Sequence, residues 1–195
     1  MAGTLSVQKI QGLASSATPT IVEIASGHKL SGAAGSIVAP GQVIQTLVAT
    51  KTDTFANTAQ SFTDIPNMTI TITPSSTSSK ILFNWNLAYG INGDIAHAYV
   101  MAVRDSTNLL VADDDGGNRT EATHVLNAYG GSGTHHVVNG VFLDSPSTTS
   151  ATVYKLQLKS SNGSAIYINR SGRDNNEAAY DGRGTSSMCV QEIAG

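Results

Sequence analysis

The sequence predicts an all-β protein, an antiparallel β-sandwich that is jelly-roll-like, with an extended N-terminal arm that trimerises or anchors the chain. Short segments alternate apolar and polar residues with a period of two, which is the pattern of half-buried strands. No window carries a sustained apolar stripe of period 3.6, so amphipathic helices are not expected. Charged residues make up only 13% of the 195 residues and 19 are glycine, as in proteins rich in strands and turns.

The clearest alternation lies in Ile65–Gly90. Its first half places Met68, Ile70 and Ile72 on one face and threonines on the other. The run Thr73–Ser79 consists of turn-forming residues, and a second alternating strand follows it. We therefore predict a hairpin whose second strand supplies the centre of the core, with the only tryptophan in an aromatic row: Ile81, Phe83, Trp85, Leu87 and Tyr89.

Residues 1–42 have a different character and are expected to form the arm. Their apolar residues occur in small groups separated by Gly, Ser, Ala and Pro. The groups are too short to form a core of their own and too apolar for a disordered tail. We expect them to be buried against other copies, in a three-fold bundle; the alternative is a linker that packs along its own domain. The residues that would trimerise or anchor the chain are Leu5, Val7, Ile10, Ile21, Ile24 and Leu30.

Residues 43–195 are expected to form the sandwich domain, with eight to ten short antiparallel strands. His97–Arg104 should form a hairpin with Leu109–Ala112 across the turn Asp105–Asn108. His135–Leu143 should pair with Ala151–Lys159. A jelly roll is favoured over an immunoglobulin-like domain because the Cys–Trp–Cys pattern is missing.

Three further features complete the predicted sandwich. Val43–Ala49 reads as the first strand. Asn162-Gly163 is a strong type I′ turn signal, so 151–169 should form one more hairpin. Ser187–Ile193 should be the last strand and lie in a central position of its sheet. Its core residues are expected to be Met188, Val190 and Ile193.

Composition excludes several classes of function. The net charge is −3 and the 11 Lys and Arg residues are scattered, so no basic face for nucleic acid is expected. No run of eighteen apolar residues predicts a membrane span, and the N-terminus lacks a secretion signal, so we expect synthesis in a cytoplasm. The single cysteine, Cys189, allows no intrachain disulfide and is interpreted as a small buried hydrophobe.

Few residues suggest chemistry. Asp113–Asp115 form an acidic run that could bind Ca²⁺, although its spacing does not match an EF-hand loop and an exposed acidic loop is favoured. His135 and His136 are adjacent and would face opposite sides of a strand, while His97 and His124 could approach each other in space. No metal site and no cofactor are expected. Because the motifs of hydrolases, zinc peptidases and P-loops are absent, we expect no enzyme.

The segment Asn169–Gly184 is long and polar for a loop, which indicates a role in binding. Arginine and tyrosine are typical of protein contacts and of saccharide recognition. We consider contact with another subunit or virion protein, contact with a glycan, and a plain solvated loop. The candidate contact residues are Arg170, Arg173, Tyr180 and Arg183.

Parts of the chain resemble virion structural proteins of marine tailed phages, such as those that infect cyanobacteria and abundant marine heterotrophs. The resemblance is most specific in Thr4–Gln45. It continues in Phe62–Phe83 with the phrase ITPSSTSSKI, and it is weak in Val190–Ile193. It implies a homotrimeric virion component with an anchoring N-terminal segment and a β-sandwich domain. The matching phrases are structural, so the resemblance implies no catalytic residues.

Together these features predict a bacteriophage virion protein that contacts other capsid or tail proteins. The leading prediction is a homotrimeric capsid-surface decoration or cement protein, or a short fibre. The alternative is a tail-fibre adhesin or a carbohydrate-binding module that recognises host surface glycans.

Overall fold

A computed structural model describes residues 26–27, 29, 31, 37–91, 97–113, 116–127, 133–179 and 181–195. The chain divides into two units, Met1–Ile37 and Val38–Gly195. The arm residues Leu5, Val7, Ile10, Ile21, Ile24 and Leu30 lie outside the described residues. The role of residues 1–42 as a trimerising or anchoring arm, and the division at residue 43, therefore stay predictions.

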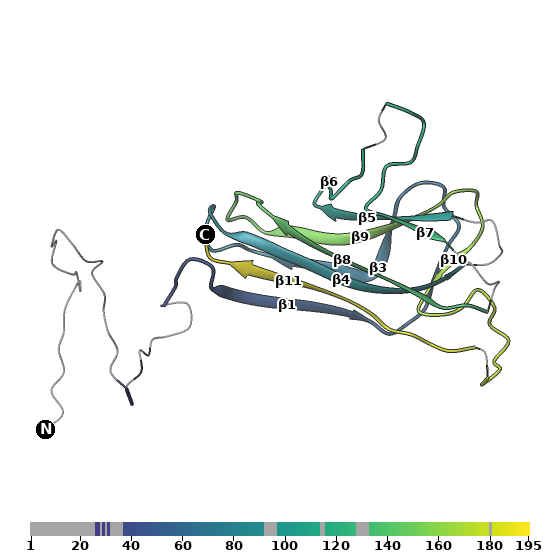
Figure 1. Ribbon diagram of the computed structural model, residues 1–195, viewed down its shortest axis with the longest axis horizontal. Coiled ribbons are helices and arrows are strands. Elements are labelled where there is room, and N and C mark those ends of the chain that lie inside the picture. The colour runs from purple at the N-terminus through teal and green to yellow at the C-terminus, as the bar shows by residue number, and fades with distance from the viewer. Residues whose placement is uncertain are drawn as a thin grey trace, which may run out of the picture. The chain divides into compact units, whose positions relative to one another are not determined.

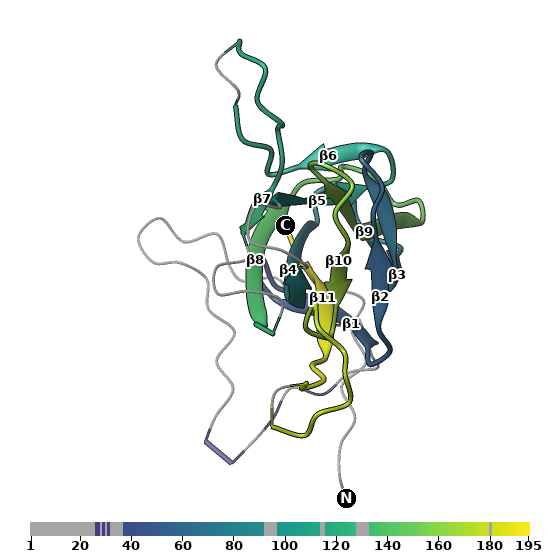
Figure 2. The same cartoon turned by 90° about the vertical axis from the view of Figure 1, so that its right-hand side faces the viewer.

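The second unit consists of two antiparallel sheets packed face to face, and the predicted all-β sandwich is confirmed (Figures 1 and 2). Sheet A contains β1 (Val43–Lys51), β2 (Phe55–Asn57), β4 (Lys80–Ile91), β8 (His136–Asp144), β10 (Ile166–Ile168) and β11 (Ser186–Ile193). Sheet B contains β3 (Thr63–Ile72), β5 (His97–Arg104), β6 (Thr107–Leu109), β7 (His124–Asn127) and β9 (Thr152–Ser160).

The strand order is that of a jelly roll. The long strands of sheet A lie in the order β1-β11-β4-β8, and those of sheet B lie in the order β3-β9-β5, with β6 and β7 sharing the far edge of β5. The chain passes from one sheet to the other between β2 and β3, β3 and β4, β4 and β5, β7 and β8, β8 and β9, and β9 and β10. Such repeated crossing places the first and last strands side by side, as in a doubly wound Greek key.

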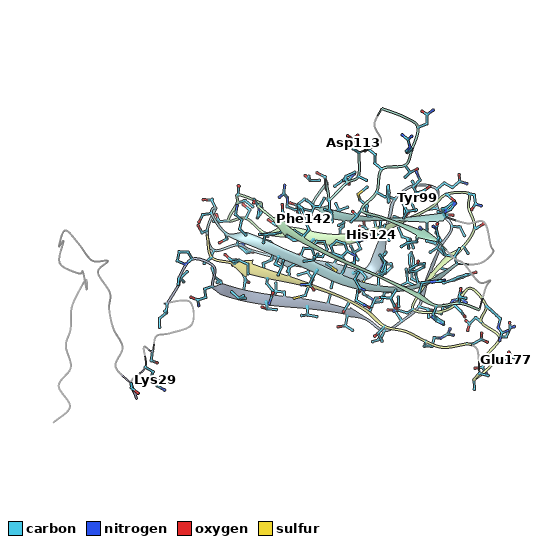
Figure 3. All side chains as sticks on the ribbon, in the orientation of Figure 1. Lys29, Tyr99, Asp113, His124, Phe142 and Glu177 are labelled. Carbon is cyan, nitrogen blue, oxygen red and sulfur yellow. The ribbon has the colours of Figure 1, made fainter. Side chains whose placement is uncertain are left out.

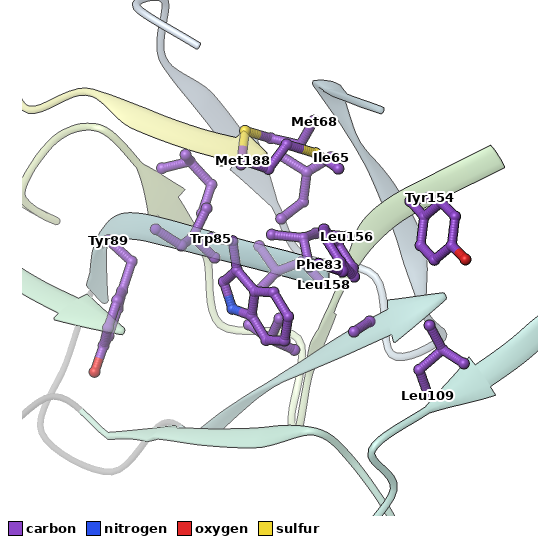
Figure 4. Packing of buried hydrophobic residues seen from close by; sticks show 14 of the residues in the cluster. Ile65, Met68, Phe83, Trp85, Tyr89, Leu109, Tyr154, Leu156, Leu158 and Met188 are labelled. Carbon is purple, nitrogen blue, oxygen red and sulfur yellow. The ribbon is translucent and has the colours of Figure 1, made fainter. Parts of the chain in front are cut away.

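The core lies between the two sheets and is centred on the aromatic row of β4, as predicted. Trp85 is 3% exposed, and its ring centroid lies 4.8 Å from that of Phe83. The phenol of Tyr154 on sheet B meets Phe83 edge-on at 5.4 Å. Figure 4 shows Trp85 and Phe83 among residues from both sheets. A Cβ atom added at Gly140, which pairs with Trp85, would lie 2.0 Å from the indole ring, so β8 requires a glycine there.

Three of the predicted strand pairings are wrong, and one hairpin is confirmed. β3 and β4 belong to opposite sheets, so Thr73–Ser79 is an arch over the edge of the core rather than a hairpin turn. The same holds for β8 with β9, and for β9 with β10. Local alternation specifies which face of a strand is buried, but not which strand lies beside it. β5 and β6 do form a hairpin, but its return strand, Thr107–Leu109, shares only Leu109 with the predicted Leu109–Ala112, and Thr107 and Asn108 belong to the strand rather than to the turn.

The last strand, β11, lies between β1 and β4, which confirms its predicted central place. Met188 and Val190 are buried as expected. The expectation for Ile193 was wrong: it lies on the outer face and is half-buried, while Glu192 points inward and is fully buried. The period of two continues to the end of the strand, so side-chain direction follows the strand rather than the polarity of each residue.

The buried Glu192 carboxylate connects the last strand of the domain with residues near its start in the sequence. It accepts hydrogen bonds from the backbone N–H of Ser75 (2.7 Å), from the Ser75 hydroxyl (2.6 Å) and from the Ser79 hydroxyl (2.7 Å). Gln45 Nε2 on β1 donates to it as well, at 2.6 Å. Burial by itself would raise the pKa of Glu192, but these hydrogen bonds outweigh burial and the pKa is lowered. The carboxylate thus holds the Thr73–Ser79 arch against β11.

Candidate functional site

The loop between β10 and β11 contains the arginines singled out by the sequence, and its base is firmly attached to sheet A. Asn169, in a left-handed conformation with φ 63°, is buried at the start of this loop. Its amide nitrogen donates to the carbonyls of Lys51 and Asp53, at 2.9 Å each, and its oxygen accepts from the Ser186 hydroxyl at 2.6 Å. Asparagine tolerates this backbone conformation better than most residues. The loop therefore starts from a fixed position.

Arg170 and Arg183 close the base of the loop through an isolated antiparallel bridge. Both guanidinium groups pair with Asp174, Arg183 at 2.8 Å and Arg170 at 3.3 Å. The Arg170 guanidinium also lies 3.8 Å from the centroid of the Tyr167 ring on β10. Asp174 therefore fixes two of the predicted contact residues side by side.

The third arginine, Arg173, forms a second group at the tip of the loop, where it pairs with Glu177 and Asp181. The distance from Arg173 Nε to Asp181 Oδ1 is 3.1 Å. The other oxygen of Asp181 accepts from the backbone N–H groups of Asn175 (2.8 Å) and Glu177 (3.0 Å). The N–H of Glu177, with Arg173, lowers the pKa of Asp181. Figure 3 shows Glu177 where the loop reaches away from the strands.

The arginine loop is thus a prearranged surface with balanced charge. Residues 169–184 carry three arginines and three acidic residues, and each arginine pairs with a carboxylate of the same loop. Arg183 is the most open of the three, with 52% of its side chain exposed. Tyr180 lies outside the described residues. The structure brings Arg170 and Arg183 together and places Arg173 in a separate group; the contact of these arginines with a partner stays a prediction.

A second candidate site, which the sequence reasoning missed, is a groove of about 510 Å³ on the outer side of sheet B. Its floor comes from β5 and β7, and its wall comes from the connection between β6 and β7, which stands away from the sheet (Figures 2 and 3). The lining residues are His97, Tyr99, Ala112, Asp113, Asn118, Arg119, Thr120, Glu121 and Val125.

Tyr99 gives this groove an aromatic wall. The ammonium of Lys159 on the neighbouring strand β9 lies 5.5 Å from the centroid of the Tyr99 ring and donates to the Thr120 hydroxyl at 3.3 Å. An aromatic ring beside charged and polar side chains suits a small polar ligand such as a sugar. The available sequence signal was Tyr99 itself, an aromatic residue at an outward position of β5.

The acidic run and the histidines form no metal site in the part of the chain that the structure describes. Asp113 lies on the rim of the groove, whereas Asp114 and Asp115 fall outside the described residues. His97 and His124 do not meet: in register they pair with Asn127 and Val100, respectively. His124 lies against Trp85 at a centroid distance of 5.8 Å, and burial lowers its pKa.

The outer face of sheet A carries two uncharged rows of side chains across four strands, which form the uncharged outer face; the exposed Lys80 at the start of β4 lies in the row beyond them. The register aligns Val48, Cys189, Asn84 and Val141 in one row, and Thr46, Gln191, Leu82 and Leu143 in the next. Val48, Val141 and Leu143 are exposed by 63%, 62% and 55%. Cys189 lies outward and half-buried within this face rather than in the core as predicted, and burial raises its pKa. Exposed aliphatic side chains gathered in uncharged rows are typical of protein-contact surfaces.

Comparison with known proteins yields matches of low similarity. No family model matches the chain, and no curated protein matches it. Among solved structures, infectious bursal disease virus Gx strain matches at 14% identity and a TM-score of 0.39, over 85% of this chain and 46% of the other. T=1 particles derived from infectious bursal virus match at 13% identity and a TM-score of 0.40, over 85% and 40%.

A third structure, infectious bursal disease virus Gt strain, matches at 15% identity and a TM-score of 0.35, over 91% of this chain and 45% of that one. The chain thus spans less than half the length of these structures. Likeness of this degree carries no argument about function. Within the described residues, no helix is long and apolar enough to cross a membrane.

Proposed function

We propose that the chain is a non-enzymatic virion structural protein that assembles with other copies and with other virion proteins. In this proposal the segment 1–42 trimerises or anchors the protein, and the sandwich projects from the particle as a capsid-surface decoration or cement protein, or as a short fibre. The observation that carries the proposal is the uncharged outer face of sheet A with its exposed valines and leucine. Such a surface favours contact with protein over contact with ions or nucleic acid.

The resemblance to marine phage virion proteins supports the same proposal. Two of its phrases, ITPSSTSSKI and the closing Val190–Ile193, meet in space where Ser75 and Ser79 bind Glu192. These phrases therefore have a structural role in the sandwich, as expected for a protein whose function is assembly. Three copies in one assembly would also multiply weak contacts with a partner.

Antibody labelling of purified virions tests this proposal. Gold-labelled antibody should decorate either the head or the tail at regular positions, which would also distinguish a decoration protein from a fibre. Deletion of residues 2–40 should lower the number of copies per oligomer, calculated from the mass in light scattering, to one third. Absence of the protein from purified virions would contradict the proposed function, and an unchanged mass after the deletion would contradict only the trimerising role of the segment.

A second candidate function is recognition of a host surface glycan, as in a tail-fibre adhesin or a carbohydrate-binding module. The groove beside Tyr99 favours it, because an aromatic face with polar neighbours is a common sugar site. Binding of the full chain to a glycan array should be lost in Tyr99→Ala and kept in Arg173→Ala if the groove is the site. The opposite pattern would place recognition on the arginine loop, and no binding by the unmodified chain would exclude this candidate.

A further inference from the structure

The edge strand β8 differs from the other edges of the sandwich. Its ladder with β4 runs from Ile81–Asp144 to Tyr89–His136 without a register shift. Within the described residues, β4 is the only strand that pairs with β8, so one side of this nine-residue strand keeps its backbone N–H and C=O groups outside any sheet ladder. A long, regular and open edge is a template for pairing with another strand.

Strand β3, which forms one edge of sheet B, shows how this protein protects an edge from pairing. β3 has a register shift between Asp64 and Thr69, and this irregular stretch contains Pro66 and Asn67, the latter with φ 64°. Asp64 adds a charge there and pairs with Lys155 at 2.9 Å. Proline, a bulge and a charged side chain all discourage a second strand from pairing.

The remaining edges are also unsuited to pairing. β2, β6 and β7 have only three or four residues each. β1 has a register shift near its start, between Val43 and Gln45, and it lies close to β3 of the other sheet. Among the described edge strands, β8 is therefore the only long strand that has neither a register shift nor another feature that discourages pairing.

The sequence of β8 fits a second copy of itself. Antiparallel pairing centred on Gly140 would place Val137 opposite Leu143 on the outer face, and Val138 opposite Phe142 on the inner face. Val141 would lie opposite Asn139. Each face thus has an apolar pair, Val137 with Leu143 or Val138 with Phe142, and the stretch from 137 to 143 contains no charged residue that would be repeated across the pair. Val137, Val141 and Leu143 are all more than half exposed, so their side chains are open to such a contact.

We infer that β8 is an interface between two copies of this chain, which pair edge to edge around a two-fold axis near Gly140. Sheet A of one copy then continues into sheet A of the other, and the uncharged outer face doubles in width. An isologous contact of this kind uses the same patch on both partners and closes on itself. The inference goes beyond the proposed function, because it assigns a contact that does not involve residues 1–42.

Mass measurement of the full chain tests the inference. In Val141→Lys/Leu143→Lys, two lysines are placed on the outer side of the edge, where they oppose strand pairing. The unmodified protein should have at least twice the mass of this variant in light scattering at the same concentration. The matched control is Val48→Lys, which adds a lysine to the same face of the same sheet at an equally exposed position on β1, and its mass should equal that of the unmodified protein.

The ratio of the masses separates this inference from the proposed trimer. If residues 1–42 trimerise the chain, the expected change is from six or more copies to three; if they do not, it is from two copies to one. Equal masses for a folded double-lysine variant and the unmodified protein would overturn the inference, whatever their absolute value. A halved mass for Val48→Lys as well would also overturn it, since the effect would then belong to the whole face.

A cross-linking experiment covers the case in which the double-lysine variant does not fold. Asn139→Cys/Val141→Cys places two pairs of thiols opposite each other in the register centred on Gly140, and only one pair in a register centred on residue 139 or 141, at a separation typical of disulfides. Mild oxidation should give a covalent dimer on a non-reducing gel. The unmodified protein, which has Cys189 alone, is the control. Failure to form more dimer than this control would overturn the proposed register and the pairing.

Discussion

Two carboxylate-centred networks, one around Glu192 and one around Asp181, differ in the length of chain that they connect. The donors to Glu192 are Gln45, Ser75 and Ser79, which lie between 113 and 147 residues away in sequence. The donors to Asp181 lie only four to eight residues away, within the arginine loop. The first network holds distant parts of the fold together, whereas the second only orders its own loop.

The two networks also differ in their surroundings. The Glu192 carboxylate is fully buried and its donors are neutral hydroxyl, amide and backbone groups. Loss of the carboxylate would leave several of these donors without a partner in the interior, which is costly. In the arginine loop the Asp181 side chain is only 2% exposed, but its partner Arg173 is 29% exposed and Glu177 57% exposed, so water and salt weaken these ion pairs. Hydrogen bonds to a carboxylate therefore have two different roles in this protein: those of Glu192 stabilise the fold, and those of Asp181 order the arginine loop.

Replacement of Glu192 by alanine should have the largest effect. The variant loses four hydrogen bonds to a charged acceptor and leaves a gap in the inner row of β11. We expect the free energy of unfolding to fall by about 3 kcal/mol. Urea denaturation followed by tryptophan fluorescence measures the change, since Trp85 lies in the core. A loss below about 1 kcal/mol would contradict the assigned role of this network.

The stability at acid pH should also depend on Glu192. Because its pKa is lower in the folded protein than its ordinary value of 4.5, the unfolded chain takes up the proton first. The carboxylate therefore contributes its full stability above about pH 4.5 and loses it as the pH falls through the lower pKa of the folded state. Glu192→Gln should flatten this part of the stability profile, as measured by denaturation at pH 3 to 6. An unchanged slope would show that other carboxylates dominate.

Asp181→Ala should affect the arginine loop and leave the sandwich nearly intact. The side chain holds Arg173 and the backbone N–H groups of Asn175 and Glu177, so its removal should loosen residues 173–183. We expect faster tryptic cleavage after Arg173 and Arg183, with a melting temperature close to that of the unmodified protein. Asp174→Ala is the matched comparison at the base of the loop. A melting temperature as low as that of Glu192→Ala would remove the distinction between the two networks.

Arg183→Ala should have the smallest effect on stability, at most about 0.5 kcal/mol, because its ion pair with Asp174 is exposed. The same variant is informative about function. If the loop contacts another virion protein, incorporation of the variant into particles should fall although its stability does not. Quantitative immunoblots of purified virions would measure this. Normal incorporation would favour a solvated loop without a partner.

Alternation in the sequence was sufficient to predict most strands and the buried row of β4, but not the strand partners. The Thr73–Ser79 segment has the composition of a turn, and the same residues suit a hairpin or an arch between sheets. The choice depends on Ser75 and Ser79 meeting Glu192, more than 110 residues away. Strict use of the two-residue period from Met188 and Val190 would have placed Glu192 inward; its polarity suggested the opposite.

The two candidate sites were predictable to different degrees. The arginine loop was visible as a polar segment, and its three arginines and three acidic residues within 169–184 made ion pairs inside the loop foreseeable, although not which partners would meet. The groove was not visible, because its floor and wall come from separate segments that only the fold brings together. The position of Asn169 also depends on such distant contacts with Lys51 and Asp53.

The central place of β11 in sheet A has a consequence for the order of folding during synthesis. The ribosome makes the chain from its N-terminus, so β1 and β4 emerge long before the strand that separates them. Until residues 186–193 are available, sheet A lacks its middle and the Thr73–Ser79 arch lacks its carboxylate. The nascent chain therefore exposes the inner face of the sandwich, and we expect it to depend on chaperones until synthesis passes this strand.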